Sequence, residues 1–314
     1  MRKKFRTRLS SVFLAMLMIL SLLTISALAE ENSYQEWSQS DALPASGSYR
    51  LMSDVTINEA PNITGSLVLD LNGRTVTLDG VGLNILKNGK LTLEDSAENG
   101  KIEITNSGRS GDRIVVSGTF TLSGGTIENQ KTNVAAVLVN TTGSCTISGG
   151  TISNTAAGAK ALMVSSGASV SVTGGTISSS VSGQTISINS AVFSMSGGYV
   201  KSAGTAIYPM NSSTVTITGG TFTDMSGNKK DVSQYIASGY QQNEEGSVVP
   251  ATEYYVDPAN GLDSNNGTGA DTALKTFAKA MELVPENGTI LVMGDLTHTI
   301  RNISKPVTIK GVGW

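Results

Sequence analysis

The carboxylates between positions 94 and 98 are the densest group of side chains in this sequence that could bind a cation. Glu94, Asp95 and Glu98 lie in one insertion between predicted strands. Calcium takes six to eight oxygen ligands, so several carboxylates must converge on it. The repeats described below supply no acidic residue between Glu128 and Asp224. Solvated loop charges are therefore the favoured interpretation, and neither a catalytic residue nor a metal ligand is predicted.

The sequence contains no complete set of residues for hydrolytic catalysis. Glycoside hydrolysis needs two facing carboxylates about 5–10 Å apart, and the repeats contain no pair of aspartates. The single histidine, His298, has no nucleophile elbow to accompany it. Residues 263–267 are similar to a calcium loop but lack the later bidentate glutamate. We expect a structural turn there.

Tyr199 and Tyr208 are the candidate carbohydrate-binding residues, because a tyrosine that points outward offers an apolar ring and a polar tip. An ordinary solvated surface is the favoured interpretation of both. The rows of Ser and Thr around them would also suit ice binding, but the mixture of two residue types is too irregular to favour that function.

A recurring Ser-Gly-Gly-Thr-Ile motif indicates which elements must position these side chains. It occurs at 123–127 and 148–152, with variants at 173–177, 196–200 and 218–222, and its first glycines are 25, 25, 23 and 22 residues apart. A nearly fixed period in this range is typical of stacked repeats.

Apolar residues occupy matching positions in every repeat, and they alternate with small hydroxylated residues. The three columns around the glycines are Phe120, Cys145, Val170, Phe193 and Val215; Leu122, Ile147, Val172, Met195 and Ile217; Ile127, Ile152, Ile177, Val200 and Phe222. The pairs Leu69/Leu71 and Leu91/Leu93 should extend the first two columns upstream. A further strand carries Val137/Val139, Leu162/Val164, Ile186/Ile188 and Ile207. Three short strands per repeat, stacked at roughly 4.8 Å, predict a parallel β-helix.

The corners and the single cysteine follow from the same register. The paired glycines should turn the chain, and Asn72-Gly73 should be another corner rather than a hairpin. A polar column of Asn129, Asn154, Ser179, Ser202 and Asp224 should bond neighbouring backbone or bond between coils. Cys145 lies in an apolar column, so we expect a buried and unreactive thiol.

The amino terminus has the features of a secretory signal peptide over residues 1–29, with a basic start, an apolar run and a small-residue cleavage site. Its removal would leave 17 Lys and Arg against 25 Asp and Glu. An acidic protein with scattered cations is a poor nucleic-acid binder. With one cysteine, the exported chain must be stabilised by its core rather than by an internal disulfide.

The predicted organisation continues with an amino-terminal cap over 30–48 and the β-helix over 49–224. Residues 225–253 should form a carboxy-terminal cap and a polar linker, with Val232, Tyr235 and Ile236 on one helical turn. A second domain should occupy 254–314: a helix from about 272 to 284 with Leu274, Phe277, Ala278 and Met281 on one face, then strands at 289–294 and 306–311. We expect this to be the cap and first coil of a second, truncated β-helix.

The glycine-marked coils over roughly 49–224 resemble the right-handed, single-stranded parallel β-helices of the pectin-lyase-like superfamily, with six to seven coils here. The segments 255–257, 261–268 and 275–280 resemble the entry cap of many bacterial β-helix proteins, including some family 9 polysaccharide lyases. The resemblance implies a bacterial, exported protein. Calcium would be a cofactor only if the chain were a lyase.

Two functions therefore remain open at this point. The favoured one is a non-catalytic cell-surface module without a cofactor, structural or adhesive, which contacts extracellular glycans or components of a cell wall or host surface. The alternative is a polysaccharide lyase or glycoside hydrolase acting on a pectin-like substrate, with its active site on coils after Trp314. Neither nucleic acid nor a transmembrane helix in the mature chain is expected.

Overall fold

A computed structural model describes residues 34–38, 42–105, 113–296 and 303–312. The predicted signal peptide and His298 lie outside these residues. In the described part, no helix is long and apolar enough to cross a membrane.

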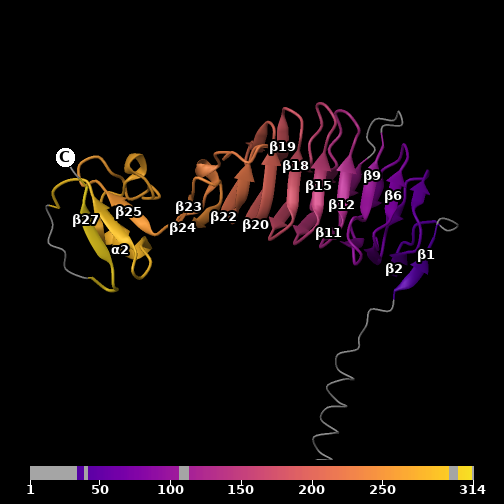
Figure 1. The fold of residues 1–314 in the computed structure, drawn as a ribbon, viewed down its shortest axis with the longest axis horizontal. Coiled ribbons are helices and arrows are strands. Elements are labelled where there is room, and N and C mark those ends of the chain that lie inside the picture. Colours follow the sequence, from indigo (N-terminus) through magenta and orange to yellow (C-terminus); the bar gives the residue numbers. More distant parts are fainter. Residues whose placement is uncertain (1–33, 39–41, 106–112, 297–302, 313–314) are drawn as a thin grey trace, which may run out of the picture.

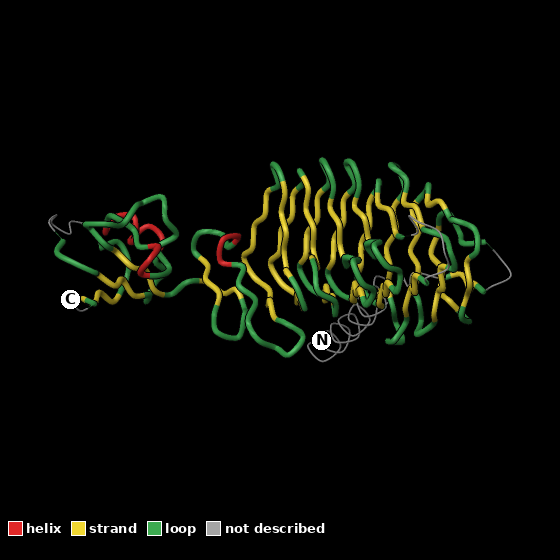
Figure 2. The backbone as a smooth tube through the Cα atoms, turned by 90° about the horizontal axis from the view of Figure 1, so that it is seen from above, coloured by secondary structure: helices red, strands yellow, loops and turns green. Residues whose placement is uncertain are grey.

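The chain is an all-β protein built on a parallel β-solenoid of about seven turns, as the repeat predicted (Figure 1). Each turn contributes strands to three faces, and the strands of the middle turns pair in parallel with their equivalents one turn earlier and later. This arrangement satisfies backbone groups that a single turn would leave unpaired. Figure 2 shows the resulting stack of coils from above.

The strands are assigned to faces by their pairing. The first face contains β1 (Gln35–Trp37), β2 (Gly47–Leu51), β5 (Ser66–Asp70), β8 (Lys90–Glu94), β11 (Thr119–Leu122), β14 (Ser144–Ile147) and β17 (Ser169–Val172). The second contains β3 (Val55–Ile57), β6 (Thr75–Leu78), β9 (Lys101–Ile104), β12 (Thr126–Asn129), β15 (Thr151–Asn154) and β18 (Thr176–Ser179). The long strands β20 (Val192–Ser202) and β22 (Thr214–Thr223) extend over both of these faces. The third contains β4 (Asn62–Ile63), β7 (Leu83–Ile85), β10 (Ile114–Val116), β13 (Val137–Val139), β16 (Leu162–Val164), β19 (Gln184–Asn189) and β21 (Thr205–Met210).

The predicted apolar columns form one continuous core inside the solenoid. Cys145, for example, lies between Phe120 and Val170 in successive strands. The predicted register of the upstream pair Leu69/Leu71 was wrong by two residues, because Leu91 pairs with Leu67 rather than with Leu69. Leu71 instead follows β5 and fills the corner beyond it, fully buried. Val215, in the last turn, is only partly buried.

The two glycines of each corner are required for different reasons. A Cβ on the first glycine would lie 2.2 Å from the carbonyl oxygen of the preceding turn, as at Gly149 and Gly174. The second glycine has a positive φ, 65° at Gly150 and 72° at Gly175, a conformation that costs glycine little. Asn72-Gly73 is also a corner, since β5 and β6 on either side of it pair with different neighbours.

The polar column forms a buried ladder inside the solenoid. Asn129 Nδ2 donates to Asn154 Oδ1 at 3.0 Å, and Asn154 Nδ2 donates to Ser179 Oγ at 3.4 Å. One turn further, Ser202 Oγ accepts from Thr185 Oγ1 at 2.8 Å. Asp224 does not continue the ladder; it closes a surface turn by accepting from Ser226 and Asn228.

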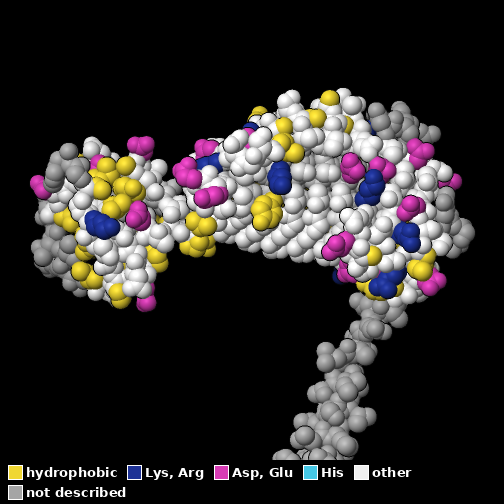
Figure 3. Space-filling model, viewed as in Figure 1, with side chains coloured by type: hydrophobic (Ala, Val, Ile, Leu, Met, Phe, Trp, Pro, Cys, Tyr) yellow, Lys and Arg dark blue, Asp and Glu magenta, His cyan; other side chains and the backbone are white. Residues whose placement is uncertain are grey.

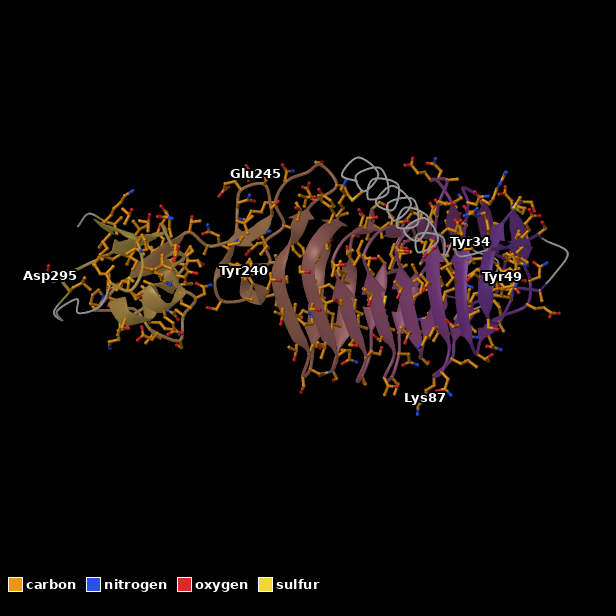
Figure 4. The ribbon with its side chains drawn as sticks, turned by 90° about the horizontal axis from the view of Figure 1, so that it is seen from below. Tyr34, Tyr49, Lys87, Tyr240, Glu245 and Asp295 are labelled. Atoms are coloured by element: carbon orange, nitrogen blue, oxygen red, sulfur yellow. The ribbon has the colours of Figure 1, made fainter. Side chains whose placement is uncertain are left out.

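Residues 225–253 close the carboxy-terminal end of the solenoid core. The expected helical turn is a 3₁₀ helix, η1 (Ser233–Tyr235), and buried Val232 precedes it. The stretch expected as a polar linker is instead an antiparallel hairpin of β23 (Tyr240–Gln242) and β24 (Val248–Pro250). Val248 joins the solenoid core, so this hairpin is part of the cap. Figure 4 labels Tyr240 and Glu245 in this region.

The remaining chain has a separate core. The strands β25 (Glu253–Val256), β26 (Thr289–Val292) and β27 (Thr308–Gly311) form a three-stranded parallel sheet. A 3₁₀ helix, η2 (Ala270–Thr272), precedes the helix α2 (Phe277–Leu283). The predicted helix began too early: Leu274 is extended and bridges Val256. Ala278 is exposed, and Ala280 and Met281 are the buried helix residues.

Candidate functional site

Asp70 is the most buried carboxylate of the first coils, and it holds neighbouring segments together. It forms an ion pair with Arg50 Nε at 2.7 Å and accepts hydrogen bonds from Ser96 N and Ser96 Oγ at 2.9 and 2.7 Å. Burial opposes ionisation, but these bonds outweigh it and hold the pKa of the Asp70 carboxyl below its usual value. These bonds tie β5 to Arg50 on β2 and to Ser96 after β8, which indicates a structural role.

Two of the three acidic residues singled out at 94–98, Glu94 and Asp95, are also bonded to neighbouring segments. Asp95 accepts from Gly73 N at 2.7 Å and from Gly100 N at 2.6 Å, which ties two corners to each other. Glu94 accepts from the Tyr34 hydroxyl. Burial and this bond raise the pKa of Tyr34 to about 12. Within the described ranges, no three His, Cys, Asp or Glu side chains are grouped so that they could hold a metal ion.

The loop at 263–267 is a structural turn that starts α2. Asp263 Oδ1 accepts from Lys275 N and Thr276 N at 3.0 and 2.9 Å, and Oδ2 accepts from Thr276 Oγ1 at 2.9 Å. Thr276 is in turn the N-cap of α2, accepting from Lys279 N at 3.2 Å. The carboxylate therefore organises the helix start.

The two candidate tyrosines lie on different faces. Tyr199 is on the second-face part of β20, paired with Thr176 and Thr221, and is 54% exposed. Tyr208 is on the third face, paired with Ser187, and is 41% exposed. The structure does not bring them together, so one sugar-binding platform cannot contain both.

The outer surface of the middle coils is poor in charge. On the first face, Thr121, Thr146, Ser171 and Ser194 form the registered outward column. In the view of Figure 3, most of this part of the solenoid is neither charged nor hydrophobic. Such a surface offers hydroxyl groups for polar contacts.

The third face carries a feature that the sequence patterns missed. The middle residues of its strands point outward, and in successive turns they are Val115, Leu138, Met163, Ser187 and Tyr208. The repeat pattern in the sequence was defined only by the inward residues on either side of these middle residues. The sequence did contain a signal for this feature, because Val115, Leu138 and Met163 are apolar residues at the outward middle position of three-residue strands. In the first two turns the matching positions carry Asn62 and Asn84 instead.

Cys145 is buried, as expected, and burial raises the pKa of its thiol to about 12. A thiol in this position has almost no thiolate at neutral pH and cannot meet a reagent at the surface.

The Cys145 thiol should therefore react with a disulfide reagent only as fast as the solenoid opens, and fully after denaturation. Absorbance of the released chromophore at pH about 8, with and without denaturant, measures both rates. Rapid stoichiometric reaction of the folded protein would contradict the buried assignment.

These observations define the class: a parallel β-solenoid in which Asp70 and Asp95 accept hydrogen bonds from backbone amides of neighbouring segments. No protein-family model matches the chain, and no significant similarity links it to a curated protein or a solved structure.

Proposed function

We propose that this protein is an exported, non-catalytic surface module that contacts extracellular glycans. The observation that carries the proposal is the outer surface of the solenoid: registered hydroxyl columns on a rigid stack, with the exposed Tyr208 on the third face. A stack in which each turn is bonded to the next on three faces holds outward groups at a fixed spacing, roughly 4.8 Å apart.

The bonding of the carboxylates supports binding over catalysis. Asp70, Asp95 and Asp263 each accept hydrogen bonds from backbone amides. A general acid or base needs a carboxyl that can reach substrate. The resemblance to pectin-lyase-like β-helices favours a carbohydrate ligand, and the predicted signal peptide favours export from a bacterium to its surface. The proposal requires no cofactor.

A glycan array probed with the purified protein tests the proposal, together with incubation of polygalacturonate and calcium. We expect binding to at least one glycan class and no formation of unsaturated product. Lyase activity would overturn the non-catalytic assignment and favour the alternative enzyme. A blank array would overturn the glycan contact and leave a structural spacer.

A further inference from the structure

The outward column of the third face forms a narrow apolar strip along the solenoid. We call Val115, Leu138, Met163 and Tyr208, with Ser187 before Tyr208, the third-face stripe. Consecutive members pair in register from β10 to β21. At roughly 4.8 Å per turn the stripe is about 19 Å long.

The strands of the third face carry no charged residue. None of its seven strands contains Asp, Glu, Lys or Arg, whereas the first two faces include ionised residues such as Lys90, Glu103 and Lys201. Within these strands an ionised ligand would find no partner, and the excess of acidic residues in the chain would repel an anionic polymer. This pattern favours a neutral ligand.

Ser187 supplies the second, independent observation. Ile186 and Ile188 on either side point into the core, so the Ser187 side chain points outward, between Met163 and Tyr208. It is only 1% exposed, and its Oγ has no hydrogen-bond partner among the described residues. A buried hydroxyl without a partner is costly, and most such groups in proteins are satisfied. A ligand hydroxyl would satisfy it once a neighbouring side chain such as the flexible Met163, paired with Ser187, moves aside.

The dimensions favour a thin ligand over a protein partner. The stripe is one side chain wide, and Val115, Leu138 and Met163 are only partly exposed. A stable protein interface buries about 800 Å² on each partner, which a single file of side chains cannot supply. Two positions further along, Asn140, Ser165 and Asn189 are partly exposed and line one side with amide and hydroxyl groups.

We propose that the third-face stripe binds an extended neutral polysaccharide along the axis of the solenoid. The Tyr208 ring stacks on the C–H face of one sugar unit, the aliphatic members contact the following units, and Ser187 Oγ hydrogen-bonds a sugar hydroxyl. This inference rests on the proposed glycan contact and narrows it to one face and one ligand class.

Affinity electrophoresis of the purified protein in gels containing hydroxyethylcellulose or polygalacturonate tests the inference. We expect retardation by the neutral polymer and little by the anionic one. Tyr208→Ala should weaken binding about tenfold, while Tyr208→Phe keeps the ring and most of the affinity. Tyr199→Ala is the matched control, an exposed tyrosine on another face, and should bind as the parent does.

Ser187→Ala separates ligand binding from folding. Removing a hydroxyl that has no partner should leave the thermal midpoint unchanged or higher, yet weaken retardation by hydroxyethylcellulose. Equal affinity of the Tyr208→Ala protein and the parent, or a preference for polygalacturonate, would overturn the inference. If Tyr208→Ala changed the sedimentation mass of the protein and not glycan retardation, the stripe would be an interface between copies instead.

The array result distinguishes the two levels of failure. Suppose that the protein binds glycans and that Tyr199→Ala, but not Tyr208→Ala, abolishes the binding. The proposed glycan contact is then correct, and the assignment of the ligand to the third-face stripe is wrong. If no glycan binds, both the proposed glycan contact and its assignment to the third-face stripe are wrong.

Discussion

Asn154→Ala should lower the free energy of unfolding by about 3 kcal/mol or more. Asn154 is 1% exposed, and its amide donates to the carbonyl oxygens of Ala156 and Ala159, both at 3.1 Å. Its Oδ1 accepts from Ala156 N at 3.2 Å and from the Asn129 amide at 3.0 Å. Alanine would leave several buried groups unpaired at once. Urea denaturation followed by circular dichroism measures the loss.

Ser153→Ala is the control for this substitution, because Ser153 is the neighbouring residue and points outward. Its removal should change stability by no more than about 0.5 kcal/mol. Asn154→Asp should destabilise the protein more at neutral pH than near pH 4, since an ionised carboxylate would face two carbonyl oxygens. Equal stability of the Asn154→Ala and Ser153→Ala proteins would refute the buried ladder.

Gly174→Ala should also destabilise the protein strongly, by about 3 kcal/mol. The backbone at Gly174 does not require glycine, since its φ is not positive. The added Cβ would lie 2.2 Å from Ser148 O in the turn beneath, and that oxygen belongs to backbone held in the parallel stack. The two turns would have to separate. The midpoint of thermal unfolding, read by circular dichroism, reports the effect.

Gly167→Ala is the matched control, because alanine there strains the backbone conformation without a close contact to another turn. Gly167 has a φ of 77°, but the nearest atom to an added Cβ is 3.8 Å away. Alanine there pays for the left-handed conformation alone, about 1 kcal/mol. If Gly167→Ala destabilised the protein more than Gly174→Ala, the close approach between turns would not be what the first glycine of each pair provides.

The architecture could be predicted from the sequence because a solenoid repeats its local rules in every turn. Register from the glycine pairs placed Cys145 in the core and Asn129 next to Asn154, as the structure has them. The same reasoning failed near β5, where no glycine pair fixed the register and Leu71 was taken for a column residue. The hairpin at 240–250 was missed because its strands are three residues long and carry little apolar pattern.

The candidate site was less predictable, because outward positions carry no packing constraint that a pattern could reveal. Tyr199 and Tyr208 were found as aromatic residues, but their separation onto different faces depends on where each turn bends. The roles of Asp70 and Asp95 depend on partners 20 to 26 residues away in sequence and one turn away in space. Spacing alone cannot show that those oxygens are already bonded.

The central claim is that the solenoid contacts glycans on its outer surface without altering them. The most direct measurement is the chain length of hydroxyethylcellulose and of polygalacturonate after prolonged incubation with the protein and calcium, on samples in which binding is also recorded. The account predicts that the neutral polymer is bound and that both are recovered at their original length. Shortened chains or unsaturated ends on either polymer would contradict it.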